Sequence, residues 1–134
     1  MIRSRVDRSA ADFAGTLVRG DFERLTEMLA ADVRMRALTP LGLVETSGAA
    51  DTVSKFASWF GDADEVELIR SGGDRFADRL HFFYRLRVRK PGEFPKLVEQ
   101  HLLCASEAGR VNNIDLVCAG FRPETGWMMH RPGS

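Results

Sequence analysis

Hydrophobic residues recur at helical spacing in three segments of the first half of the chain, with polar residues between them. Spacings of three and four residues place such a set on one face of a helix. Gly20 is expected to end the first helix, Asp21 to cap the second, and Ser47 and Gly61 to bound the third. The predicted buried faces are Val6, Ala10, Phe13 and Leu17, then Phe22, Leu25 and Leu29, then Val53, Phe56 and Phe60.

Elsewhere the pattern changes to alternation, which is typical of strands. A short strand is predicted over 33–38, between the second and third helices, running into a loop at Pro40 and Gly42. Four more are predicted over 65–71, over 75–90 and in the two arms of a hairpin within 98–118, with turns at 72–74, 90–95 and 107–110. This order predicts an α+β fold in which three N-terminal helices pack on the concave face of a curved, mainly antiparallel sheet.

The pairing register decides which residues of the hairpin face the helices. The strand over 75–90 carries mostly apolar residues at even positions and arginines at odd ones, so its even residues are predicted to face the core. If the next turn is centred on Gly92-Glu93, Tyr84 lies opposite His101, and odd residues of the following strand also face inward. An odd-length loop at either turn would change this assignment. The predicted inner wall is Phe82, Tyr84, Leu86, Glu99, His101, Leu103, Ile114, Leu116 and Cys118.

The same register leaves an outer wall that is too apolar for water, which indicates an association surface. We therefore expect a homodimer packed sheet to sheet. Cys104 and Cys118 are predicted to point to opposite faces, where no disulfide can join them. The predicted outer wall is Phe83, Val98, Gln100, Leu102, Cys104, Asp115, Val117 and Ala119.

Composition narrows the class of protein. The 134 residues suffice for one domain, predicted over 1–123 with a C-terminal tail at 124–134. The formal net charge is zero, so neither nucleic acid nor an anionic membrane is an expected partner. No apolar run approaches the ~20 residues of a spanning helix, and two cysteines suit a reducing compartment, so we expect a cytoplasmic protein. The three histidines lack metal-ligand spacing, and no metal or other cofactor is expected.

Four segments resemble the nuclear transport factor 2-like superfamily, which includes ketosteroid isomerases and polyketide cyclases. They are the corner VRGDFERLTEMLAADV, the loop around LTP, the helix DTVSKFASWFG and the closing GRVNNIDLV, and the likeness spans Val6 to Pro123. The resemblance implies a cone with a pocket between the helices and the concave sheet, and dimers formed through the outer sheet. The isomerases' tyrosine donor, aspartic acid donor and aspartate base would fall on Phe13, on His101 and near Thr39. All three positions depart from the pattern, so ketosteroid isomerase activity is not expected.

His101, Tyr84 and Glu99 are the candidate catalytic residues. An imidazole exchanges protons near neutral pH, and a neighbouring carboxylate and phenol could orient it. The alternative is a satisfied polar network inside an apolar wall. The candidate ligand-binding residues are Phe13, Leu17, Arg36, Phe56, Trp59, Phe82, Leu103, Leu116 and Cys118, since such pockets are mostly apolar with a few polar groups.

The preferred functional hypothesis is a dimeric pocket protein that binds a small apolar molecule, with catalysis left open. The alternative is a non-catalytic dimerisation module whose cone is filled by its own side chains. Arg36 could clamp an anionic group, or could be ordinary solvated charge at a strand edge. The tail carries Trp127, Met128 and Met129, which could cover the pocket or the partner subunit, although disorder is the default for a terminus.

Overall fold

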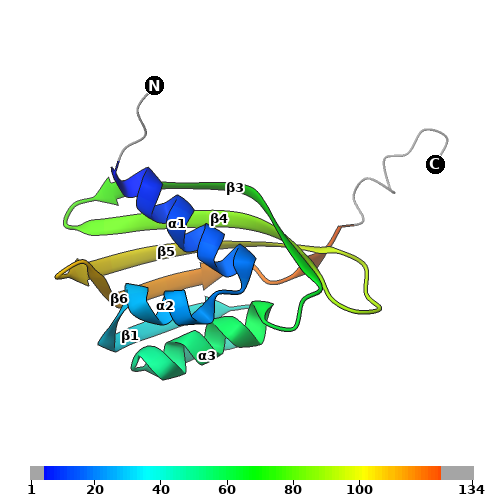
Figure 1. The fold of residues 1–134 in the computed structure, drawn as a ribbon, viewed down its shortest axis with the longest axis horizontal. Helices are drawn as coiled ribbons and strands as arrows, with labels where there is room; N and C mark the ends of the chain where they lie inside the picture. The colour runs from blue at the N-terminus through cyan, green and yellow to red at the C-terminus, as the bar shows by residue number, and fades with distance from the viewer. Residues whose placement is uncertain (1–4, 125–134) are drawn as a thin grey trace.

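A computed structural model describes residues 5–124 and shows a curved sheet with all three helices on one of its faces (Figure 1). The helices are α1 (Arg5–Arg19), α2 (Phe22–Met28) and α3 (Ala49–Phe60). The α+β fold class is therefore confirmed. The predicted tail lies outside the described residues, apart from its first residue, Glu124. Among the described residues, no helix is long and apolar enough to cross a membrane.

Seven strands form the sheet. They are β1 (Leu29–Thr39), β2 (Gly42–Ser47), β3 (Glu65–Phe76), β4 (Arg79–Arg89), β5 (Lys96–Glu107), β6 (Arg110–Cys118) and β7 (Arg122–Pro123). The strand order is β2-β1-β6-β5-β4-β3, and β7 pairs with β5. Every pairing is antiparallel except that of β1 with β6, which is parallel. The sequence pattern missed β2 and the two-residue β7, and it placed the start of β1 four residues late.

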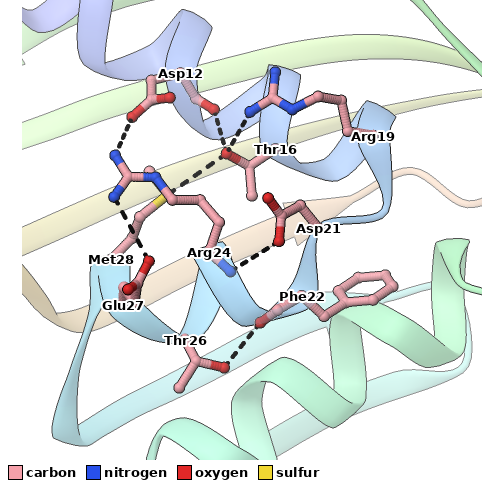
Figure 2. A network of polar contacts seen from close by, with 9 residues as sticks. All are labelled: Asp12, Thr16, Arg19, Asp21, Phe22, Arg24, Thr26, Glu27 and Met28. Atoms are coloured by element: carbon pink, nitrogen blue, oxygen red, sulfur yellow. Dashed lines mark hydrogen bonds and ion pairs between the residues drawn. The ribbon is translucent and has the colours of Figure 1, made fainter.

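The corner between α1 and α2 forms as the sequence predicts (Figure 2). Gly20 adopts a positive φ of 65°, which glycine tolerates without strain. The Asp21 carboxylate accepts a hydrogen bond from the Arg24 backbone N–H at 3.1 Å, which caps α2. The Arg24 guanidinium also reaches back to Asp12 of α1, at 3.1 Å. These contacts join α2 to α1 at the corner.

The turn predicted at 72–74 is wrong, because β3 continues through it to Phe76. A Cβ on Gly73 would lie 3.0 Å from the Cβ of Ala10 and from the carbonyl oxygen of Val6, so α1 packs directly on this part of β3. The backbone N–H of Gly73 also donates to the Asp7 carboxylate at 3.0 Å. The glycines here allow a helix to pack closely on a strand. Glycines in such a position cannot be told from turn glycines by sequence alone.

The register predicted between β4 and β5 is also wrong. Tyr84 lies opposite Gln100, not His101, so the even residues of β5 face the helices. Val98, Gln100, Leu102 and Cys104 are buried, whereas Glu99, His101 and Leu103 lie on the outer face. The observed pairing of β4 with β5 differs by one residue from the pairing that the predicted turn implies. A shift of one residue moves every side chain of a strand to the opposite face of the sheet.

The inward side of β6 was nevertheless predicted correctly, because two errors cancel. The turn at Ala108-Gly109 is where the sequence indicates, but a bulge between Ala105 and Ser106 shifts the register by one residue. Ile114, Leu116 and Cys118 are therefore buried as expected. Cys104 and Cys118 face the same way, contrary to prediction, and both are free thiols. Cys104 pairs with Ile114, four residues before Cys118, so about 13 Å of strand separates the two thiols.

Candidate functional site

A pocket of about 600 Å³ opens at one end of the cone. The turn between β1 and β2, helix α3 and the chain that follows β6 form its walls. Its lining is mostly apolar, which is typical of a small-molecule site. The lining residues are Thr39, Pro40, Leu41, Val44, Lys55, Trp59, Cys118, Ala119, Gly120, Phe121, Arg122 and Pro123.

Close packing at Gly120 closes one side of this pocket. Gly120 has a φ of 95°, and a Cβ there would lie only 2.8 Å from Cγ of Pro40. The chain after β6 can therefore approach the β1–β2 turn closely only because this residue is glycine. Phe121 then packs against Phe60 of α3, with ring centroids 5.9 Å apart.

Trp59 forms the aromatic wall that α3 contributes. Its ring meets Phe56 edge to face at 5.4 Å, and Phe60 at 6.3 Å. Because Phe56 and Phe60 are buried, their packing fixes the indole while leaving it partly exposed to the pocket. Trp59 and Cys118, two of the predicted ligand-binding residues, are both in this lining.

Two cations, Lys55 and Arg122, lie among the lining residues, and the lining contains no acidic side chain. The Lys55 ammonium lies 5.8 Å from the centroid of the Trp59 ring. Among the described residues, neither cation has a carboxylate partner within salt-bridge distance. The pocket therefore combines an apolar wall with uncompensated positive charge.

A buried polar pair lies next to this pocket inside the cone. The Tyr84 hydroxyl donates to Oε1 of Gln100, and both side chains are fully buried. Gln100 lies opposite Cys118, a pocket residue, on the neighbouring strand. The Gln100 Nε2 group has no hydrogen-bond partner among the described residues. Burial raises the pKa of Tyr84 well above its usual value, so its hydroxyl remains a neutral donor.

The predicted trio of His101, Tyr84 and Glu99 is not brought together. Tyr84 is inside the cone, while His101 and Glu99 lie on the outer face of the sheet. There His101 Nε2 lies 2.7 Å from Glu99 Oε2, and the Arg85 Nε–H donates to Glu99 Oε1 at 2.9 Å. The hydrogen bond with His101, followed by that with Arg85, lowers the pKa of Glu99 despite partial burial.

The remaining predicted ligand residues are divided among three places. Leu17, Phe56 and Leu116 are core residues. Phe13 and Phe82 touch a second hollow of about 410 Å³, between α1, α2 and the tips of the long strands. Arg36 and Leu103 line a shallow groove on the outer face, together with His81 and His101.

Sequence reasoning missed most of the pocket wall: Pro40, Lys55, Phe121 and Arg122 were not among the candidates. One signal was available, because the resemblance places the isomerases' base near Thr39, which does line the pocket. Cys118 faces inward and His101 outward, so this thiol and this imidazole cannot act together. Burial raises the pKa of Cys104 to about 12, so this thiol is inert at neutral pH.

No family model matches the chain, and neither does any curated protein. Solved structures do share its fold. One is named as a SnoaL-like polyketide cyclase from Shewanella putrefaciens, with a TM-score of 0.69 and 10% identity over 87% of this chain and 91% of its own. Another is a protein of ketosteroid isomerase-like fold from Catenulispora acidiphila, in complex with trimethylamine, with a TM-score of 0.64 and 14% identity over 86% and 85%. A third is named as a ketosteroid isomerase from Kribbella flavida, with a TM-score of 0.60 and 18% identity over 95% and 88%.

At these identities the likeness concerns the fold. The chain has the nuclear transport factor 2-like cone fold, as the sequence resemblance implied.

Proposed function

We propose that the protein binds a small, largely apolar molecule with a negatively charged end in the pocket between α3 and the β1–β2 turn. The observation that carries this proposal is the lining itself: about 600 Å³ of mainly apolar wall, with Lys55 and Arg122 as its only charged members. An apolar body would remove the exposed wall from water. A carboxylate or similar anion would then meet two cations that have no salt-bridge partner among the described residues.

Binding without acid–base catalysis fits this lining best. The pocket wall includes no histidine, aspartate or glutamate, and these are the usual general acids and bases. The isomerases' base would fall near Thr39, and a threonine hydroxyl does not replace a carboxylate there. One neighbour is in complex with trimethylamine, an amine that is protonated in neutral water; the charge of the present pocket favours a ligand of the opposite sign.

The test is a thermal-shift and fluorescence screen with matched probes: aromatic and medium-chain carboxylates against their amides and alcohols. Trp59 lines the pocket, so its emission should change on binding, and a Trp127→Phe background removes the other tryptophan. A carboxylate at 100 times its dissociation constant should stabilise the fold by about 2.7 kcal/mol. Amides should bind at least tenfold more weakly.

Lys55→Met and Arg122→Met should each weaken carboxylate binding and leave binding of the amides unchanged. Lys96→Met is the matched control, because Lys96 pairs with Glu93 and does not line the pocket. Equal binding of acids and amides would refute the anionic end. No response to any probe would refute the pocket function.

Association of two chains through the outer face is the second candidate, and a specific observation supports it. Leu38, Leu43 and Val117 lie on neighbouring strands and are each more than half exposed. They line one groove with Leu103. The corrected register moves four predicted outer residues into the core, so this surface is smaller than the sequence indicated.

A further inference from the structure

A row of close polar contacts crosses the outer face of the sheet, on β3, β4 and β5. Nε2 of His81 lies 3.1 Å from Nδ1 of His101, and the two ring planes differ by only 8°. The other nitrogen of each ring faces a carboxylate. Nδ1 of His81 lies 3.1 Å from Asp74, and Nε2 of His101 lies 2.7 Å from Glu99.

The carboxylates decide which ring nitrogens carry hydrogen. An ionised carboxylate only accepts, so Nδ1 of His81 and Nε2 of His101 must be the donors. In two neutral rings, the nitrogens that face each other then both present lone pairs. Two lone pairs 3.1 Å apart repel unless a positive charge lies between them. A proton shared by the two rings is one solution, and a metal ion is the other.

We propose that His81 and His101 bind a divalent transition-metal ion, such as Zn²⁺, Ni²⁺ or Cu²⁺, on the outer face of the sheet. Imidazole nitrogens suit these metals and bind them at roughly 2.0–2.1 Å. Two such bonds meeting at a bent angle span a nitrogen separation close to the observed 3.1 Å. Because the ring centroids are 5.3 Å apart and the planes nearly parallel, the two nitrogens point almost straight at each other, so each ring must turn about its side-chain torsions to bind one ion. Donation of the second ring nitrogen to a carboxylate is the usual arrangement around metal-bound histidine.

The strands hold the two rings in place for this role. His101 lies opposite Phe83, two residues from His81 on the same face, so the histidines are diagonal neighbours on adjacent strands. The Phe83 ring lies almost parallel to both imidazoles, at 5.5 Å from His101 and 5.9 Å from His81. Both side chains are therefore held on one face of the sheet, within reach of a single ion.

Solvent can reach the site and complete the coordination. The side chains of His81 and His101 are 31% and 45% exposed, and both line the outer groove. Within residues 5–124, no group of three or more histidine, cysteine, aspartate or glutamate side chains is arranged to hold a metal. Water must therefore supply the remaining ligands. With only two protein ligands and Arg36 in the same groove, a micromolar dissociation constant is expected.

The experiment is isothermal titration of the full chain with Ni²⁺, Zn²⁺ and Cu²⁺ salts. We expect one ion per chain, bound most tightly as Cu²⁺. His81→Gln and His101→Gln should each abolish this binding, and Asp74→Asn or Glu99→Gln should weaken it by about tenfold or more. His130→Gln is the control, because it removes the only other histidine and should leave the affinity unchanged.

A spectroscopic measurement on the unaltered chain covers the case in which a variant fails to fold. Electron paramagnetic resonance of the Cu²⁺ complex should show coupling to two imidazole nitrogens. Absence of binding, binding that survives both histidine substitutions, or a spectrum without two imidazoles would each overturn the proposal. None of these results bears on the pocket at the end of the cone.

Discussion

At the scale of single residues, a buried polar pair joins β4 to β5 on the inner face of the cone. Tyr84 and Gln100 are fully buried among apolar side chains, and each supplies the other's hydrogen bond. The Phe13 ring stacks on Tyr84 at 6.1 Å and covers it from the α1 side. A buried polar group that loses its partner costs more than the hydrogen bond contributes. The pair should therefore behave as a unit.

Tyr84→Phe should destabilise the protein by about 1–3 kcal/mol, because it leaves Oε1 of Gln100 buried without its donor. The double variant with Gln100→Leu removes both polar groups and should recover much of that loss. Urea denaturation of the wild type, the two single variants and the double variant measures the coupling. Simple additivity of the two single losses would contradict the pairing.

At the scale of elements, α1 packs closely on β3 because Gly73 has no side chain. Gly73 allows α1 to lie against the strand, whereas the sequence pattern predicted a turn at Gly72 and Gly73. The actual turn lies at Ala77-Asp78, where Ala77 has a positive φ of 56°. Local turn preference is weak compared with the packing of a whole helix, so tertiary contacts decide which use of glycine applies.

Gly73→Ala should destabilise the fold by about 1–3 kcal/mol, because the new methyl group meets the backbone of α1 and of β4 at 3.0 Å. Gly15→Ala is the matched control. A Cβ at Gly15 would meet only the flexible Arg19 side chain, and alanine in a helix interior is favoured by about 0.5–1 kcal/mol. Thermal unfolding should thus move in opposite directions for the two variants. A neutral Gly73→Ala would show that α1 does not need this close approach.

At the scale of the whole molecule, the two faces of the sheet differ in character. The helix-covered face is filled by its own side chains, so the open pocket lies at the end of the cone rather than in its centre. The outer face carries a polar row on β4 and β5 and an apolar patch on β1, β2 and β6. Apolar exposure of this kind is concentrated at protein contacts.

If two chains associate through that patch, Leu38→Glu and Val117→Glu should each shift the protein from dimer to monomer at micromolar concentration. Sedimentation velocity measures the change. Phe94→Glu is the control, since Phe94 is 78% exposed in the β4–β5 connection, away from the patch. A wild-type protein that sediments as a monomer would exclude the dimer.

The sequence by itself determined the helices, most of the strands and the α+β class. Periodicity alone identifies which face of an element is apolar, as it did for Phe13 and Leu17 on α1 and for Tyr84 on β4. The resemblance also indicated Thr39 as a position near a site.

Only the tertiary structure decided which way β5 faces and where the pocket opens. A single residue in the β4–β5 connection moves His101 from the inner wall to the outer face, and both faces of β5 carry enough apolar residues to suit either arrangement. The pocket wall could not be predicted from the sequence either, because Pro40, Lys55 and Phe121 come together only in the folded sheet. Contacts between residues so distant along the chain leave no local pattern in the sequence.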